Sequence, residues 1–153
     1  MAEERIERRI AAVFAADVVG YSGLVERDEI GTRARLNAAF DGIIAPALER
    51  LFKTMGDGFL AEFASVVEAV DCAGVIQKGC SDKSDLVLRI GINLGDVIVE
   101  GDDLHGDGVN VAARIEALAE PGGISMSRSA RDQIRDKMNV TLHDRGEVEV
   151  KNI

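Results

Sequence analysis

The segment FKTMGDGFLAEF, residues 52–63, constrains the fold more than any other part of the chain. Its two apolar halves are joined at Gly56-Asp57-Gly58, which is the composition of a β-hairpin, with strands expected over 51–56 and 58–63. A hairpin turn needs glycine. It does not need a carboxylate at its tip, or Lys53 on the strand that enters it. The segment therefore predicts an antiparallel sheet and raises a question of function.

The first half of the chain supplies further elements around this hairpin. The run RIAAVFAADVVGYS predicts a buried strand over about 10–17. Apolar residues at three- and four-residue steps predict a helix from 21 to about 51, kinked or broken at Pro46. Ser65, with Glu68 at the capping-box spacing, predicts a helix over 65–79.

The second half continues the alternation. LVLRIGINLGDVIVEG is interpreted as two strands joined near Gly95-Asp96, and GDDLHGDG as a polar, glycine-rich loop. VNVAARIEALAE is helical and ends at Pro121-Gly122-Gly123. ISMS predicts a short strand, and Ser127 or Ser129 a cap for a helix over about 129–138. VTLHDRGEVEVKNI closes the chain with strand-like alternation.

These elements predict one domain of α/β (α+β) class. The expected architecture is a ferredoxin-like or palm-like sheet, mixed but mostly antiparallel, with helices packed against it. The 153 residues are enough for a sizeable core.

Composition limits the partners and the setting. The net charge of −9 argues against a broad surface for nucleic acid or anionic membrane, although it leaves room for a nucleotide held by metal ions and a few cations. No apolar run is long enough for a transmembrane helix, and MAEERIERRI lacks the apolar core of a signal peptide. Cys72 and Cys80 are interpreted as buried or bystander thiols in a reduced, cytoplasmic setting. His105 and His143 have no metal-ligand spacing.

Asp17 is the first candidate site residue. It stands where the first strand ends and a turn at Gly20-Tyr21 opens a helix. A carboxylate there suits a divalent cation, and the N–H groups of the following turn suit phosphate oxygens. The alternative is that Asp17 only satisfies backbone donors in the turn.

Asp57 is the second candidate. Its flanking glycines permit a sharp turn and leave space for a ligand, although this segment taken alone is better explained as an ordinary Asp-Gly hairpin. If the strands carrying Asp17 and Asp57 are neighbours, the two acids form a two-metal site for phosphoryl transfer.

The helix that follows GDDLHGDG supplies the third candidate. Asn110 and Arg114 are four residues apart and share one helical face. An amide beside a guanidinium suits a phosphate or a developing oxyanion. The alternative is a solvated helix face.

The strand ending at Asp17, then FKTMGDG, then DDLHGDGVNVAAR, in this order, resemble the class III nucleotidyl cyclase catalytic domain, in particular that of bacterial adenylate cyclases. The resemblance runs from about Arg9 to Ile153. It implies that ATP is converted to cyclic AMP and pyrophosphate. The ribose 3′ oxygen attacks the α-phosphorus with the help of two divalent cations, Mg²⁺ or Mn²⁺.

The resemblance also implies roles for individual residues. Asp17 and Asp57 match the metal-binding pair, and Lys53 and Asp103 the base-selecting pair. Asn110 and Arg114 match the pair that stabilises the transition state, with Asn110 orienting the ribose and Arg114 touching the phosphates. Lys151, in the short motif EVKNI, matches a lysine that contacts the terminal phosphates. Gly20 and Tyr21 fall in the phosphate-binding turn.

The chemistry of the bases favours ATP. Adenine offers an acceptor at N1 and a donor amine at N6, which suit the Lys53 ammonium and the Asp103 carboxylate. Guanine has the opposite pattern, so both contacts would fail.

Family members act as head-to-tail dimers with sites at the interface. The two aspartates come from one subunit, and Lys53, Asp103, Asn110 and Arg114 come from the other. A homodimer is therefore expected, in which Lys53 and Asp57 of one hairpin serve different sites.

The chain departs from the family pattern in two places. ALERLFKTMGDG and GCSDKSDLVLRIG, near 49–52 and 80–86, are shorter than in many relatives, either as true deletions or as residues absent from the printed chain. Two other functional classes remain open: a catalytically inactive nucleotide-binding or dimerising module, and a guanylate cyclase. A diguanylate cyclase is disfavoured, because MGDGF stands where a GGDEF-like turn would be required. The family's last strand usually continues beyond KNI, so a longer parent protein is expected.

Overall fold

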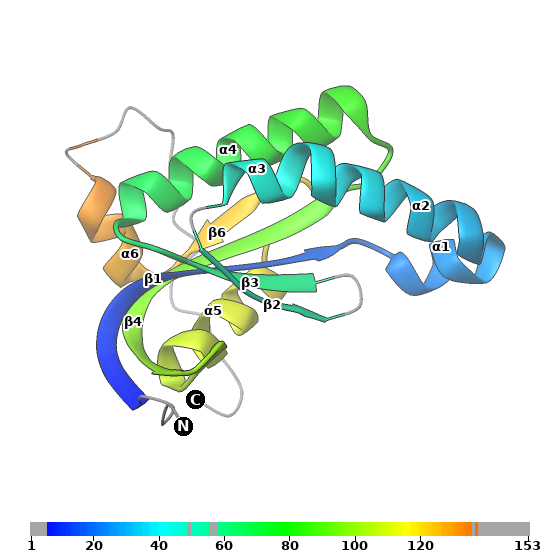
Figure 1. Ribbon diagram of the computed structural model, residues 1–153. Coiled ribbons are helices and arrows are strands. Elements are labelled where there is room, and N and C mark those ends of the chain that lie inside the picture. The colour runs from blue at the N-terminus through cyan, green and yellow to red at the C-terminus, as the bar shows by residue number, and fades with distance from the viewer. Residues whose placement is uncertain (1–5, 49, 56–57, 136, 138–153) are drawn as a thin grey trace.

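One curled sheet organises the molecule (Figure 1). The computed structural model describes residues 6–48, 50–55, 58–135 and 137, and for 50–55 it describes the backbone alone. Within these residues six strands pair in the order β2-β3-β1-β4-β5, with β6 beside β4. Their bounds are β1 Ile6–Val18, β2 Arg50–Met55, β3 Gly58–Phe63, β4 Leu88–Glu100, β5 Asp103–His105 and β6 Ile124–Met126.

Two long strands form the centre of the sheet. β1 and β4 pair antiparallel over their whole length, from Ile6 opposite Glu100 to Val18 opposite Leu88. The hairpin strand β3 lies antiparallel on the other side of β1, and β6 runs parallel to β4. The expected mixed, mostly antiparallel sheet with flanking helices is confirmed.

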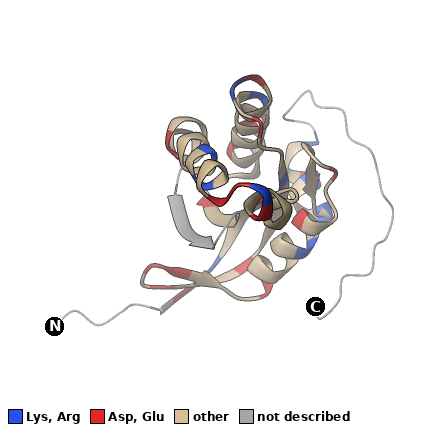
Figure 2. Ribbon diagram, turned by 90° about the vertical axis from the view of Figure 1, so that its right-hand side faces the viewer, with Lys and Arg blue, Asp and Glu red and all other residues tan. Residues whose placement is uncertain are grey.

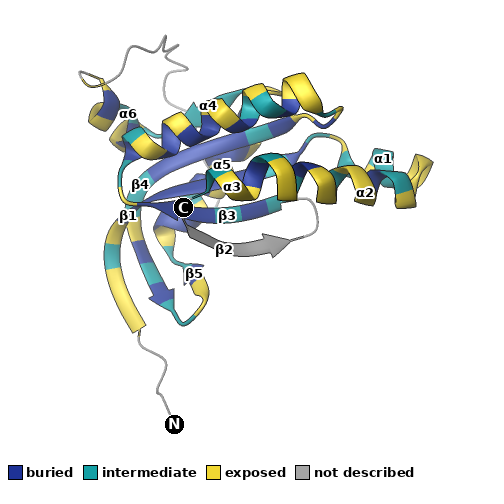
Figure 3. Ribbon diagram, turned by 45° about the horizontal axis from the view of Figure 1, so that its top comes forward, coloured by how far each residue is buried: buried dark blue, intermediate teal, exposed yellow. Residues whose placement is uncertain are grey.

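The helices lie on both faces of this sheet. They are α1 Tyr21–Arg27, α2 Glu29–Ala39, the π-helical turn η1 Phe40–Ile44, α3 Ala45–Ala47, α4 Val66–Lys83, α5 Asp107–Ala117 and α6 Arg128–Ile134. In Figure 3, α2, α3 and α4 cover one face, here called the α4 face, and α5 covers part of the other, the α5 face. No helix of the described residues is long and apolar enough to cross a membrane.

The two faces have separate cores. On the α4 face, the ring centroid of Phe14 lies 5.8 Å from that of Phe59 and 5.7 Å from that of Phe63, and Phe40 meets Phe59 edge-on at 5.9 Å. Aliphatic side chains of α4, β4 and α6 surround these rings. On the α5 face, smaller residues of β1 and β4, among them Ala11, Val13, Ala15 and Val97, pack against Ala112 and Val109 of α5.

The interpretation of LVLRIGINLGDVIVEG as two strands was wrong. β4 is one strand of 13 residues that runs through Gly95 without a turn. A Cβ atom on Gly95 would lie 3.2 Å from the Cα of Gly108 in α5, so this glycine allows the helix to approach the strand. The chain turns instead at Gly101, which has a φ of 59°. The loop GDDLHGDG contains the short strand β5.

The long helix expected from 21 to about 51 is divided. Asp28 ends α1 and caps α2, because its carboxylate accepts a hydrogen bond from the Gly31 N–H at 3.0 Å. The helical path then widens into the π turn η1 and ends at Ala47, one residue after Pro46. The break that Pro46 predicted is confirmed.

Other local predictions agree with the structure. Ser65 caps α4 by accepting from the Glu68 N–H at 3.1 Å, although the helix continues to Lys83 rather than ending near 79. Ser127 caps α6, and ISMS forms β6. The closing segment VTLHDRGEVEVKNI lies outside the described residues.

Candidate active site

Asp17 lies near the carboxyl end of β1. Strand alternation places it on the α5 face with Val13 and Ala15, and its register partner on β4 is Arg89. The side chain is half-buried, and its Oδ1 atom is buried with no hydrogen-bond partner in the described part of the chain. A buried carboxylate oxygen without a donor is unfavourable unless a cation accompanies it. Asp17 therefore fits the hard, divalent metal ion that the resemblance implies.

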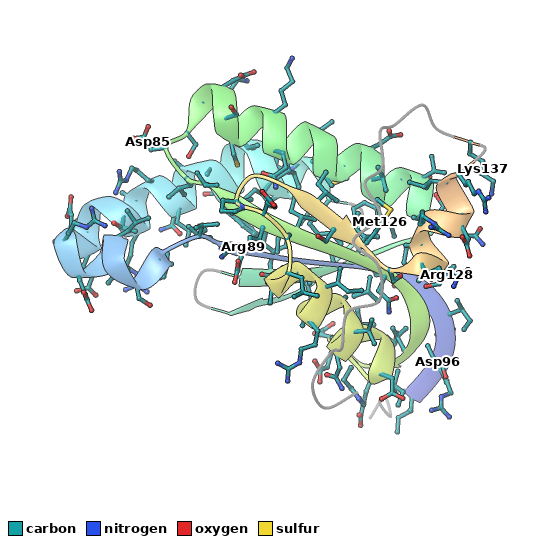
Figure 4. All side chains as sticks on the ribbon, turned by 180° about the vertical axis from the view of Figure 1, so that it is seen from behind. Asp85, Arg89, Asp96, Met126, Arg128 and Lys137 are labelled. Atoms are coloured by element: carbon teal, nitrogen blue, oxygen red, sulfur yellow. The ribbon has the colours of Figure 1, made fainter. Side chains whose placement is uncertain are left out.

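Arg89 is a site candidate that sequence interpretation missed. Its Nε atom donates to the carbonyl of Ala119 at 3.0 Å, which holds the side chain on the α5 face of β4 across from Asp17. Figure 4 shows Arg89 beside one end of α5. In the sequence, Arg89 could be noticed only as a single basic residue within the apolar segment RIGIN. The register of β4 against β1 is needed to show that it lies opposite Asp17.

The turn at Gly20-Tyr21 leads directly out of this end of β1. Gly20 adopts left-handed φ and ψ of 66° and 27°, and a Cβ atom there would meet nothing within 4 Å. Tyr21 begins α1 and packs, half-buried, against the core of the α4 face. The backbone beside Asp17 is therefore open to a ligand at Gly20.

The hairpin lies next to β1, as a metal site formed by Asp17 and Asp57 would require. β3 is the antiparallel neighbour of β1, with Phe59 opposite Ala16. Gly58, at the start of β3, pairs with Met55 at the end of β2. The condition that the strands carrying Asp17 and Asp57 are neighbours is thus met, while Asp57 itself lies outside the described residues.

Lys53 and Asp103 lie on the two strands at the ends of the sheet order. Lys53 pairs with Leu60 in the hairpin, next to a register shift after Leu51, and its side chain is outside the described set. Asp103 is exposed at the start of β5, and its Oδ1 accepts from the Leu104 N–H at 3.0 Å. The sheet curls far enough for β2 and β5 to contact each other, which brings the strands that carry the two residues together.

Asn110 and Arg114 stand one turn apart on the exposed side of α5. The opposite side of the helix, with Val109, Ala112 and Ile115, is buried against the sheet. Amphipathic packing therefore fixes which way the two polar side chains face. The prediction that they share one accessible face is confirmed, while their catalytic roles stay predictions.

An ion pair ties β1 to the hairpin on the same face. Arg9 donates from Nε and Nη2 to the two carboxylate oxygens of Glu62, at 2.8 and 2.5 Å. Hydrogen bonding to Glu62 raises the pKa of the Arg9 guanidinium above its ordinary value. The pair fastens the strand that leads to Asp17 to the strand that follows Asp57.

The remaining sequence candidates do not form a second site. Cys72 and Cys80 are both free and buried, and burial raises the pKa of the Cys72 thiol to about 11. His105 Nε2 lies 3.3 Å from a Glu100 carboxylate oxygen. Among the described residues no three His, Cys, Asp or Glu side chains gather as metal ligands. Asp57, the predicted partner of Asp17 in a metal site, is not among these residues. Lys151 and His143 also lie outside them.

Comparison with known proteins identifies the family. The model of the adenylate and guanylate cyclase catalytic domain matches residues 4–152. The chain therefore belongs to this family of class III cyclase domains.

Individual relatives agree with this assignment. The putative adenylate cyclase 3 of Rhizobium meliloti is 47% identical over 164 residues, covering 100% of this chain and 28% of that protein. A crystal structure of an adenylate/guanylate cyclase/hydrolase from Silicibacter pomeroyi has a TM-score of 0.91 and 39% identity, covering 97% of this chain and 93% of that one. The adenylyl cyclase CyaB from P. aeruginosa shares the fold, with a TM-score of 0.86, 23% identity, and coverage of 97% and 91%.

The curated relatives are longer proteins. The chain spans 28%, 36% and 30% of the length of the first three, all named as adenylate cyclases, the first as a putative one.

Proposed function

We propose that the chain is an adenylate cyclase domain that converts ATP to 3′,5′-cyclic AMP and pyrophosphate. The observation that carries the proposal is the Oδ1 of Asp17, near the end of a central strand of a cyclase fold, which is buried and has no hydrogen-bond partner among the described residues. The 47% identity to a putative adenylate cyclase supports the choice of reaction. A cytoplasmic location, where ATP is available and free thiols persist, belongs to the same proposal.

Base selection is assigned to Lys53 and Asp103. The Lys53 ammonium donates to adenine N1, and the Asp103 carboxylate accepts from the N6 amine. Asp103 is exposed and already accepts one backbone hydrogen bond through Oδ1, so its orientation is partly fixed before a nucleotide arrives. The contact between β2 and β5 supports a joint role for the two residues.

Phosphate and ribose contacts are assigned to the exposed face of α5 and to the end of β1. Asn110 orients the ribose, and Arg114 stabilises charge that develops on the phosphates. Lys151, Arg89 and the Gly20-Tyr21 turn hold the remaining phosphate oxygens. The ribose O3′–Pα bond forms as the bond from Pα to pyrophosphate breaks, and the proton of the 3′ hydroxyl leaves to solvent.

Asp17 and Asp57 are the residues that would hold two divalent cations. When bound, such cations neutralise triphosphate charge and make the 3′ hydroxyl easier to deprotonate. The protein's own contribution is the carboxylate of Asp17, which is half-buried and whose Oδ1 meets no competing donor in the described part of the chain.

A site shared across a homodimer agrees with the layout of one chain. Arg89, opposite Asp17, and Glu100, opposite Asp103, stand at the two ends of β4. The eleven residue steps from Arg89 to Glu100 correspond to roughly 36 Å of strand. Two equivalent sites, each combining Asp17 and Asp57 of one subunit with the base-selecting and α5 residues of the other, would use both ends of every chain.

The decisive experiment identifies the product. The purified chain is incubated with Mn²⁺ and either ATP or GTP over a range of protein concentrations, because a weak dimer loses activity on dilution. Cyclic AMP from ATP is expected. Cyclic GMP as the main product would overturn the assignment of Lys53 and Asp103, and nucleotide binding without turnover would indicate a regulatory module.

Mixing variants tests the shared site. Asp57→Ala and Lys53→Ala chains are each expected to be inactive. Random pairing restores one intact site in half of the dimers, so an equal mixture should regain about a quarter of wild-type activity. The shared-site model is wrong if activity does not return although heterodimers form.

A further inference from the structure

The seating of α5 on β4 depends on direct backbone contact. A Cβ atom on Gly91 would lie 2.3 Å from the amide nitrogen of Glu116 and 2.7 Å from the carbonyl of Ala112. Near the start of the helix, a Cβ on Gly108 would lie 2.5 Å from the carbonyl of Asp96. The helix therefore rests on the strand at two points, with no side chain between them to absorb a displacement.

Asn93 lies between these contacts. It follows Gly91 by two residues on β4, on the α5 face, and is only 4% exposed. Its Nδ2 atom donates to the carbonyl of Gly108 at 3.0 Å. This bond joins the sheet to the first turn of α5, and it is the one side-chain bond from β4 to that turn that the described residues show.

The acceptor side of Asn93 faces α6. Its Oδ1 lies 3.4 Å from the Oγ of Ser129, whose single hydroxyl proton is donated to the carbonyl of Leu94 at 2.7 Å. The strong hydrogen bond of this buried amide is therefore the one that its Nδ2 donates to Gly108. Asn93 therefore fixes where the first turn of α5 lies along the strand.

The first turn of α5 leads directly into the proposed catalytic face. Asn110 is two residues beyond Gly108, and Arg114 is one turn further. Because α5 is a short, continuous helix, a small rotation or slide of its first turn moves both side chains together. Displacements of about 1 Å at reacting groups cost up to roughly 100-fold in rate.

We infer that Asn93 is a positioning residue of the cyclase reaction: by bonding the Gly108 carbonyl it sets the register of α5 on β4 and, through the helix, the placement of Asn110 and Arg114. The inference rests on the proposed function of those two residues. Asn93 does not contact substrate. Its effect falls on transition-state stabilisation, while nucleotide binding by Lys53 and Asp103, which lie on other elements, is preserved.

The test replaces Asn93 by leucine, which has a similar shape but neither donor nor acceptor. The Gly108 carbonyl keeps its ordinary helical partner, so no bare buried group is created at that end. Ile92→Val is the matched control, because Ile92 is the preceding residue of the same strand and is buried on the opposite face. If leucine prevents folding, Asn93→Val, with a smaller and strand-favouring side chain, takes its place.

Three quantities are measured on the whole chain: kcat, KM for ATP with Mn²⁺, and amide hydrogen exchange of residues 107–117. For Asn93→Leu, kcat should fall roughly 10- to 100-fold. Its KM for ATP should stay near the wild-type value, as expected for an interaction that acts on the transition state. Exchange in α5 should accelerate. Ile92→Val should keep a kcat near wild type.

The inference is overturned if kcat of Asn93→Leu falls no further than that of Ile92→Val, or if KM rises by as much as kcat falls. Failure of the proposed function is distinguishable, because the wild-type chain would then make no cyclic nucleotide. In that case the exchange measurement still decides whether Asn93 holds α5: faster exchange of 107–117 supports it, and unchanged exchange overturns it.

Discussion

The two faces of the sheet are built differently from the same strands. On the α4 face, alternate residues of β1 meet a broad core of phenylalanine and aliphatic side chains. On the α5 face, the intervening residues of β1 are Arg9, Ala11, Val13, Ala15 and Asp17, and the opposing positions of β4 include Gly91, Asn93 and Gly95. One face buries large side chains, and the other keeps small, polar and charged ones.

This difference separates stability from chemistry. Large apolar side chains give most of the free energy of folding, because transfer from water scales with the area buried. Small residues allow α5 to lie directly on β4, and they leave room for Asp17 and Arg89 at the end of the face. Acidic and basic residues are mixed on the helices that surround the sheet (Figure 2).

The largest effect is expected from Phe14→Ala, which removes a fully buried ring from the α4 face. The free energy of unfolding should fall by about 3–5 kcal/mol. Val13→Ala, at the adjacent position on the α5 face, removes fewer atoms and should cost clearly less. Urea denaturation of both variants measures the difference. Equal losses would contradict the assignment of the main core to the α4 face.

Asp17→Asn should strongly reduce activity without loss of stability. Loss of the proposed metal ligand should lower kcat by roughly 100-fold or more, since even outer partners of a metal site contribute up to that much. Without metal, the free energy of unfolding of the variant should be at least that of the wild type, because the substitution removes the negative charge of a carboxylate whose buried Oδ1 has no donor among the described residues. Cyclic AMP formation and thermal unfolding with and without Mn²⁺ provide the measurements, with Mn²⁺ expected to stabilise only the wild type. Normal activity of the variant would exclude Asp17 as a ligand.

Deprotonation of the Cys72 thiol, in the core of the α4 face, should lower the free energy of unfolding at high pH. Burial raises the pKa of this thiol to about 11 from an ordinary value of 9.0, so the folded state holds its proton more tightly than the unfolded state does. The stabilisation is complete below pH 9 and is lost as the pH rises toward 11, to the extent of roughly 2 kcal/mol.

Cys72→Ser is the matched variant, because a serine hydroxyl can also donate to the Ala47 carbonyl that the thiol contacts at 3.1 Å. Denaturation midpoints between pH 8 and 11 should decline less in this variant than in the wild type. Part of the decline should remain, since burial also raises the pKa of the Cys80 thiol. Identical pH profiles would show that Cys72 does not titrate as a buried thiol.

The smallest effect is expected from Arg9→Lys on the α5 face. Lysine keeps the charge but cannot make the two parallel hydrogen bonds to Glu62, so a loss of about 1 kcal/mol is expected. Arg8→Lys is the control, because the Arg8–Asp96 pair is exposed, at 3.4 Å, and should contribute almost nothing. Equal unfolding free energies for the two variants would mean that the Arg9–Glu62 pair is no stronger than a surface pair.

Much of the fold could be predicted from local patterns in the sequence. The alternation of FKTMGDGFLAEF identified the hairpin, and the spacing of Ser65 and Glu68 identified the start of α4. Both signals act between residues close in the chain. The shared face of Asn110 and Arg114 followed from helical periodicity alone.

The parts that could not be predicted depend on contacts between distant residues. Gly95 was interpreted as a turn because glycine commonly marks one. In the structure, the lack of a side chain at Gly95 instead allows Gly108 of α5, thirteen residues later, to approach the strand. Arg89 and Asn93 were not singled out as site residues because each sits singly in an apolar strand. Their importance follows from the register of β4 against β1 and from the position of α5.

The single strand β4 also has a consequence for how this family can change in length. Side chains alternate between the faces along a strand, so inserting or deleting one residue reverses every face beyond that point. A change of that kind after Ile92 would turn Leu94 toward α5 and Val97 toward the opposite face, and would alter the spacing between Arg89 and Asp103. Length variation is therefore expected to accumulate in the connecting segments, such as those that precede β2 and β4, while β4 keeps its thirteen residues. In Figure 4, Arg89 and Asp96 mark this strand. Its constant length would keep the residues at its two ends at a constant separation, while the loops of the fold are free to vary in length.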